Sequence, residues 1–321
     1  MEIISNPTQV EIKKAAQALM DGHLVAFPTE TVYGLGADAT NRKAVSRIYS
    51  VKGRPTTHPL IVHVSSINQV NTWTSHIPNY AIKLAKEFWP GPMTLILKRS
   101  HLVGEFITGG QDSVGIRVPS DPIALMLLTE FEKLGGSGIA APSANKFAAV
   151  SPTSADAVVE EISFKLKNKD IIIDGGSCSI GIESTIIECT GPYPRVLRPG
   201  SITLELMENL LGTIEEKAPL NTGIRASGML EIHYAPKAKL FIGEMAQPKD
   251  GLLALSSYPT PEGVIRLASP NNLEEFARDL YKSLRFADQL NLTRIVVIPP
   301  PGDGIALAIR DRLIKASAGS K

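Results

Sequence analysis

An irregular polar stretch over residues 200–236 divides this sequence into two regions that each alternate short apolar runs with helical patterns. The stretch continues through glycine, serine and asparagine to the tetrapeptide HYAP at 233–236. Such composition between periodic segments is typical of linkers, and a length of 321 residues suits about two domains. We therefore predict a larger domain over residues 1–203, a linker over 204–236 and a smaller domain over 237–321.

Hydrophobic periodicity predicts an α/β fold for both regions. In the first region the predicted helices are 9–22, 44–49, 82–88, 122–134 and 154–162, and the strands are 24–27, 60–64, 94–97, 114–118, 139–141, 171–173, 184–187 and 196–197. A short helix is predicted at 204–211. In the second region strands are predicted at 238–243, 252–257, 263–268 and 294–298, and helices at 273–290 and 303–317. This alternation favours a small domain with a mostly parallel sheet.

Composition excludes several classes of protein. Hydrophobic residues make up 43% of the chain, and 33 basic residues against 32 acidic residues give a net charge of +1. This argues against disorder, collagen, a coiled coil and a basic nucleic-acid arm. Neither a secretory signal nor an apolar run of roughly 20 residues is evident. Because Cys178 and Cys189 form no CxxC pair, we expect two reduced or buried thiols in a cytoplasmic protein, with a disulfide between them as the alternative.

Two motifs in the first region suggest phosphate binding. Gly34 and Gly36 follow a predicted strand and permit close backbone approach, although a tight turn explains them equally well. Lys52 and Arg54 flank Gly53; if these residues are extended, both cations point to one side and suit a triphosphate. The alternative is a solvated basic pair.

Further polar groups occur at strands or at their ends. Arg117 alternates with apolar neighbours, which indicates either a substrate carboxylate or a structural salt bridge as its partner. Ser143 and Asn145, with Ser151 soon after, supply hydroxyl and amide groups, and the alternatives are a serine nucleophile or simple turn formation. A third set comprises Ser184, Thr185 and Arg198. The sequence has no Walker A motif and no histidine spacing typical of metal sites, so we expect no protein-only metal site.

In combination, these motifs resemble the YrdC/Sua5 family. The resemblance is dense over residues 5–200 and is carried by TETVYGL (29–35), KGR (52–54), HPL (58–60), WPGPMTL (89–95), GIRVP (115–119) and PSAN (142–145). It continues through SGM (227–229), HYAP (233–236) and DGIALAIRDRL (303–313), which resemble the linker and C-terminal domain of the long Sua5 type.

The resemblance implies a fold and a reaction. The fold would be a twisted α/β domain with a large concave, positively charged cavity, followed by a small Rossmann-like domain. The reaction would convert L-threonine, bicarbonate or CO2 and ATP into threonylcarbamoyl-AMP and pyrophosphate. The product would serve N6-threonylcarbamoyladenosine formation at position 37 of tRNA, with other proteins performing the transfer.

The resemblance also implies the residues of the site. Lys52 and Arg54 would be catalytic as well as nucleotide-binding, and Mg2+ would be held mainly by the phosphates. L-Threonine would contact Thr31, His63, Arg117, Ala141 and Ser184. ATP would contact Lys52, Arg54, His58, Ser113, Ser143, Asn145, Ser151 and Arg198, with His233 or Tyr234 closing over the nucleotide.

Three other functions compete with this interpretation. The first is a double-stranded RNA or tRNA-binding module without chemistry, against which stand the low aromatic content and the lack of a long basic patch. The others are a carbamoyl-transfer domain and a serine hydrolase that uses Ser143. We interpret the linker as a lid that protects a water-sensitive intermediate, with an ordinary spacer as the alternative.

Overall fold

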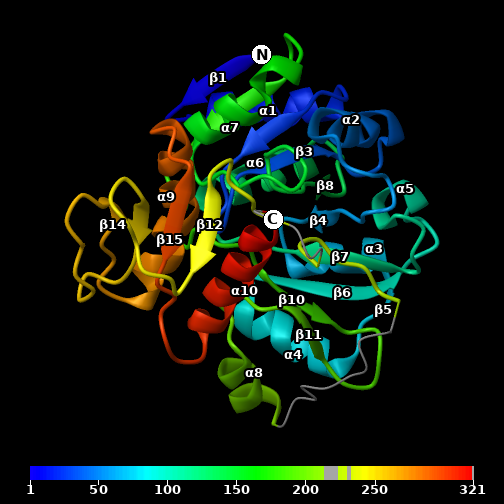
Figure 1. Cartoon of the computed structure of the whole chain (residues 1–321). Helices are drawn as coiled ribbons and strands as arrows, with labels where there is room; N and C mark the ends of the chain where they lie inside the picture. Colours follow the sequence, from blue (N-terminus) through cyan, green and yellow to red (C-terminus); the bar gives the residue numbers. More distant parts are fainter. Residues whose placement is uncertain (213–222, 230–232, 320–321) are drawn as a thin grey trace.

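The computed structural model describes residues 1–212, 223–229 and 233–319. Within them the chain forms two β-sheets of unequal size, each with associated helices (Figure 1). The larger sheet belongs to the region before residue 200, and the smaller sheet belongs to the region after residue 236. The α/β class predicted from the sequence is confirmed.

Eleven strands of the described residues form the larger, mixed sheet. They are β1 (Glu2–Ser5), β2 (Val25–Phe27), β3 (Gly34–Asp38), β4 (Ile61–His63), β5 (Thr74–His76), β6 (Met93–Arg99), β7 (Ser113–Arg117), β8 (Ile139–Ala140), β9 (Ile171–Asp174), β10 (Thr185–Glu188) and β11 (Arg195–Arg198). Their order is β1-β9-β2-β3-β8-β4-β7-β6-β10-β11, and β5 pairs with β6. The central strands are almost entirely buried.

Helices cover this sheet with their apolar positions. They are α1 (Gln9–Met20), α2 (Arg42–Lys52), α3 (Val70–Trp73), α4 (Asn79–Phe88), α5 (Glu105–Thr108), α6 (Pro122–Lys133), α7 (Ala155–Ile162) and α8 (Leu204–Leu211). Short 3-10 helices occur at Ile67–Gln69 and Ser163–Lys165. Several begin with side-chain caps, such as Asp121, which accepts from two backbone amides of α6. Met207 of α8 is buried in the core of the larger domain.

The second sheet contains four parallel strands among the described residues. They are β12 (Lys239–Ile242), β13 (Gly251–Leu253), β14 (Ile265–Ala268) and β15 (Arg294–Val297), in the order β12-β15-β13-β14. The associated helices are α9 (Leu273–Gln289) and α10 (Ile305–Ala318). The predicted α/β pattern of this region is therefore confirmed.

The two domains share a hydrophobic core. Val32, Val150 and Ile182 of the larger domain pack in one cluster with Tyr234 and with Tyr281 of α9. Tyr281 of α9 and Arg312 of α10 contact Glu183 of the larger domain, and Figure 1 shows α10 between β12 and β10. The smaller domain is thus packed directly onto the region that carries the pocket described below.

Three local predictions are wrong. Gly34 and Gly36 lie within strand β3, not in a tight turn; a Cβ on Gly36 would come within 2.9 Å of Phe27, so this close strand packing requires glycine. Lys52 is not extended but ends helix α2, because Gly53 adopts the left-handed conformation (φ 65°) that terminates helices. In addition, the strand predicted at 252–257 ends at Leu253.

Candidate active site

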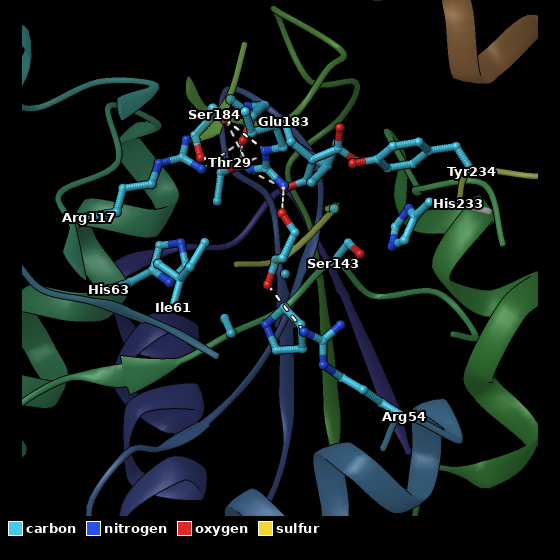
Figure 2. A pocket seen from close by; sticks show the side chains of 18 residues that line it. Thr29, Arg54, Ile61, His63, Arg117, Ser143, Glu183, Ser184, His233 and Tyr234 are labelled. Carbon is cyan, nitrogen blue, oxygen red and sulfur yellow. Dashed lines mark hydrogen bonds between the residues drawn. The ribbon is translucent and has the colours of Figure 1, made fainter. Parts of the chain in front are cut away.

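A pocket opens where the ends of several strands of the larger sheet meet the linker (Figure 2). About 540 Å³ of free space, part of it open to solvent, lies among its side chains. In Figure 2, Arg117 and His63 lie on one side, whereas His233 and Tyr234 lie on the other, with Ser143 between them. The predicted residues that line it are Thr31, Arg54, His63, Arg117, Ala141, Ser143, Ser184, Arg198, His233 and Tyr234.

Strand register brings His63 and Arg117 together. They are opposed residues at the ends of the parallel strands β4 and β7. The guanidinium of Arg117 forms an ion pair with Glu30 (2.7 Å) and donates to the Thr31 hydroxyl (2.9 Å). Of the two partners predicted for Arg117, the structure therefore contains the salt bridge, and Arg117 also faces the pocket.

His63 is a neutral group at physiological pH. Burial and the nearby charge of Arg117 lower its pKa to about 3. The ring of Phe27 meets it edge-on, with 6.1 Å between ring centroids. Its Nδ1 atom is buried and has no hydrogen-bond partner among the described residues. Since buried polar atoms are normally hydrogen-bonded, this atom remains available as a hydrogen-bonding group at the pocket.

Arg198 and Ser184 both line the pocket and are hydrogen-bonded to each other. Arg198, the last residue of β11, donates through Nε and Nη2 to the Ser184 carbonyl (3.1 and 2.9 Å) and through Nη1 to the Ser227 carbonyl (3.1 Å). The Ser184 hydroxyl also shares a hydrogen bond of 2.8 Å with Thr94. The buried guanidinium of Arg198 therefore joins Ser184, just before β10, to Ser227 of the linker.

Arg54 is a second cation that lines the pocket and contacts the linker. Its Nη2 atom donates to the Pro59 carbonyl (2.9 Å) and to the Ser227 hydroxyl (3.2 Å). Burial lowers its pKa to about 10, which leaves it charged at neutral pH. Its Nε atom has no partner among the described residues. Arg54 therefore retains a donor for an anionic ligand.

The linker contributes His233 and Tyr234, both of which line the pocket. Their rings meet edge-on at 4.0 Å between centroids. Burial lowers the pKa of His233 to about 3, so its imidazole is neutral. His233 Nδ1 and the Tyr234 hydroxyl are buried and, within the described parts of the chain, have no hydrogen-bond partner. Both residues therefore present unsatisfied polar atoms, and the structure favours neither alone.

Comparison with known proteins places this architecture in a family. Residues 17–200 match the Sua5/YciO/YrdC family model, described as telomere recombination, and residues 202–318 match the threonylcarbamoyl-AMP synthase C-terminal domain. The chain belongs to the Sua5-type threonylcarbamoyl-AMP synthases. The resemblance drawn from the motifs is thus confirmed over both domains.

Similar Sua5-type proteins occur in distant organisms. The chain is 41% identical to threonylcarbamoyl-AMP synthase of Pyrococcus abyssi, covering 96% of this chain and 94% of that protein. It is 38% identical to the Bacillus subtilis protein, with 99% and 95% covered. The crystal structure of P. abyssi Sua5 complexed with L-threonine superposes with a TM-score of 0.87 at 39% identity, covering 99% of this chain and 98% of that one.

Five predicted site residues of this Sua5-type chain lie outside the pocket lining. Lys52 donates to the carbonyls of Ser143 (2.6 Å) and Asn145 (2.5 Å), and thereby supports the loop on which Ser143 lies. Asn145 and Ser151 are buried, and Ser151 donates to Glu183, which lines the pocket. His58 packs edge-on against Phe147, and Ser113 lines a separate surface hollow.

Other lining residues of the Sua5-type pocket were missed by the sequence predictions. The chief example is Glu183, a buried carboxylate that accepts from Ser151, Tyr281 and Arg312. Its partners Tyr281 and Arg312 are 98 and 129 residues further along the chain, so no local pattern reveals them. Thr29, whose hydroxyl belongs to the TETVYGL motif and was not assigned a role, also lines the pocket and shares a hydrogen bond of 2.8 Å with Thr31.

Three further features concern only the residues that the structure describes. Among these residues, no group of three or more His, Cys, Asp or Glu side chains is arranged to hold a metal ion. None of the described helices is long and apolar enough to span a bilayer. Cys178 and Cys189 are free and buried, which confirms the expectation of reduced or buried thiols.

Proposed function

We propose that this pocket forms threonylcarbamoyl-AMP and pyrophosphate from L-threonine, bicarbonate or CO2 and ATP. The observation that carries the proposal is that Arg117 and neutral His63 lie opposite the linker rings of His233 and Tyr234 in a pocket that Arg54 and Arg198 also line. The names of the relatives and the threonine complex of P. abyssi Sua5 support the same assignment. We further propose that the product serves tRNA modification in the cytoplasm, with other proteins transferring it to tRNA.

On the threonine side, Arg117 would bind the substrate carboxylate. Its ion pair with Glu30 holds the guanidinium in place, and the remaining contacts of Thr31, Ala141 and Ser184 would enclose the amino acid. A neutral His63 would accept or donate one hydrogen bond without repelling Arg117. The carboxylate and hydroxyl of threonine match this combination of one cation and several uncharged polar groups.

On the nucleotide side, Arg54 and Arg198 would bind the phosphates. Ser143, His233 and Tyr234 also line this part of the pocket and would contact the nucleotide. Lys52 and Ser151 are bonded to Ser143 and Glu183, which line the pocket, and Lys52 also holds Asn145. We propose that Lys52, Asn145 and Ser151 support these lining residues and approach ATP only if the lining rearranges. Contacts of His58 and Ser113 with ATP would require a larger rearrangement.

The chemistry follows from this placement of charge. The threonine amine captures CO2 as a carbamate and releases a proton; a carbamate oxygen then attacks the α-phosphorus, and the bond to pyrophosphate breaks. Negative charge grows on the leaving pyrophosphate, where buried arginines stabilise it more strongly than water would. Arg54 and Arg198 are therefore assigned the stabilising role, with Lys52 as the cation that fixes the Ser143 loop.

Magnesium would enter with ATP as part of the substrate. The pocket carboxylate Glu183 is already engaged by Arg312, and Glu30 is paired with Arg117. Neither is free to form a protein cage, which agrees with the tendency of Mg2+ to bind mainly through phosphates and water. The described residues thus do not fit a dedicated metal site, and no catalytic step is assigned to one.

The linker would act as a lid over the reacting groups. Four residues of the linker line the pocket, namely Ser227, Gly228, His233 and Tyr234. Closing the pocket would keep water from the carbamate and the mixed anhydride. Other parts of the predicted linker, 213–222 and 230–232, lie outside the described residues. We retain the predicted limits of 1–203, 204–236 and 237–321 as a proposal, with α8 at the start of the linker packed on the core of the larger domain.

Replacing Arg54 tests the assigned role of the phosphate-binding cations. We expect Arg54→Ala to slow pyrophosphate release by about 30- to 1,000-fold, the range for loss of a group that acts in the transition state. Lys14→Ala is the control, because it removes an exposed cation paired with Glu2. Unchanged kcat and KM in Arg54→Ala would remove Arg54 from the scheme.

The same assay distinguishes the rival function of RNA binding without chemistry. A binding module predicts no ATP turnover in the presence of threonine and bicarbonate, with or without RNA. The synthase predicts pyrophosphate release that requires threonine. Binding of tRNA to a protein that also turns over ATP would make RNA a partner of the enzyme.

A further inference from the structure

The buried carboxylate of Glu183 joins the two domains at the edge of the pocket. It lines the pocket beside Ser184 (Figure 2). One oxygen accepts from the Ser151 hydroxyl (2.6 Å), and the other accepts from the Tyr281 hydroxyl (2.8 Å) and from Nε of Arg312 (3.0 Å). Two of its three partners therefore come from helices α9 and α10 of the C-terminal domain.

Arg312 and Tyr281 also hold the linker ring of Tyr234. The guanidinium carbon of Arg312 lies 5.6 Å from the centroid of that ring, and Tyr281 stacks on it at 5.5 Å with an interplanar angle of 27°. Arg312 is fully buried, and its second ion pair is with Asp311. Arg312 and Tyr281 thus hold both Glu183, which lines the pocket, and Tyr234 of the linker.

The C-terminal domain supplies the cation that is paired directly with Glu183. Burial alone would raise the pKa of Glu183, but the charges of Arg312 and Arg198 lower it to about 2. Without Arg312, an ionised Glu183 would lose its nearest cation inside the protein, which is strongly unfavourable. The carboxylate would then shift or take up a proton, and Ser151 would lose its acceptor.

Ser184 does not depend on this cluster to the same degree. Its carbonyl and hydroxyl are held by Arg198, and its hydroxyl also contacts Thr94. Arg117 is held by Glu30 and Thr31, and its strand β7 pairs with β4, which carries His63. A disturbance at Arg312 or Tyr281 should therefore reach the nucleotide side of the pocket and spare the threonine side.

We propose that Arg312 and Tyr281 are positioning residues through which the C-terminal domain completes the ATP-binding side of the pocket. They touch no substrate themselves and act through Glu183, Ser151 and Tyr234. This inference rests on the proposed function, since it assigns ATP and threonine to opposite sides. It gives the C-terminal domain a direct role in the reaction of the larger domain.

The test compares the two substrates in the full-length chain. Tyr281→Phe keeps the stacked ring and removes only the hydroxyl, so we expect the KM for ATP to rise roughly three- to tenfold, within the range of coupling between neighbouring residues. Arg312→Gln should raise it roughly tenfold or more. The KM for threonine should change less than twofold in both variants. Gln289→Ala, which removes a different interdomain hydrogen bond to Glu160, should leave both values unchanged.

Equilibrium binding of ATP, measured by calorimetry, separates this inference from the proposed function. If the wild-type protein released no pyrophosphate, the proposed function would fail, whereas weaker ATP binding in the variants would still support the positioning role. If Arg312→Gln failed to fold, Tyr281→Phe would decide the question. An unchanged ATP affinity in folded Tyr281→Phe, or equal losses for ATP and threonine, would overturn the inference.

Discussion

Two neutral histidines make the pocket sensitive to acid. The pKa values of His63 and His233 are lowered to about 3, mainly by burial, whereas an unfolded histidine titrates near pH 6.5. Above pH 6.5 neither histidine changes the stability. As pH falls below that value the unfolded chain binds protons that the folded chain excludes, so the free energy of unfolding decreases.

The predicted loss is measurable at mildly acidic pH. At pH 5.5 each histidine should lower the free energy of unfolding by about 1.4 kcal/mol relative to pH 7.5. Urea unfolding of His63→Gln at the two pH values should show a pH dependence that is smaller by this amount. His76→Gln, which alters an exposed histidine, is the control. An identical pH dependence in the wild-type protein and His63→Gln would contradict the assigned neutral state.

Individual site residues differed in how far the sequence could predict them. Arg117 was recognisable because a cation alternated with apolar residues on a strand, and its partner had to be anionic. Both the ion pair with Glu30 and the position at the pocket follow from that. Glu183 carried no such signal, because its importance comes from Tyr281 and Arg312 in another domain.

Within the linker, the position of Gly228 is restricted by both its backbone conformation and its neighbours. Gly228 has a φ of +82°, and a Cβ atom there would lie 2.5 Å from the Tyr234 hydroxyl and 3.0 Å from Cδ of Arg198. A side chain at this position would therefore displace Tyr234 of the linker and Arg198 of β11, which are both assigned to the nucleotide side. Close packing as well as backbone conformation requires glycine at this point.

Gly228→Ala should therefore impair ATP binding more than folding. We expect its KM for ATP to rise by roughly tenfold, with a loss of about 1 kcal/mol in stability from the left-handed backbone. Gly223→Ala is a matched control, because Gly223 has a φ of +72° but no described atom within 4 Å of the added Cβ. Equal KM values for ATP in the two variants would show that the contacts with Tyr234 and Arg198 are unimportant.

Most elements were predictable because their periodicity and end signals agree. Helix α6 begins with Asp121 and Pro122 and is followed by glycines, and it forms almost as predicted. The end of α2 was not predictable in the same way, since Gly53 stops the helix only after Lys52. The direction of Lys52 therefore depended on one backbone conformation that the sequence alone did not specify.

For the molecule as a whole, the net charge of +1 conceals a local concentration of cations. Arg54, Arg117 and Arg198 come from distant parts of the chain and line one pocket. The sequence predicted this convergence only through the family resemblance, because charge counts do not show which strands become neighbours. The packing of the C-terminal domain onto Glu183 was not predictable at all, since it depends on the fold of both domains.

The most direct measurement is detection of the product itself. The purified full-length protein is incubated with ATP, Mg2+, L-threonine and bicarbonate, and the mixture is analysed by mass spectrometry; omission of threonine is the control. The account predicts threonylcarbamoyl-AMP together with pyrophosphate, and neither when threonine is omitted. Absence of the adenylate from a reaction with folded protein, or ATP cleavage that does not depend on threonine, would contradict it.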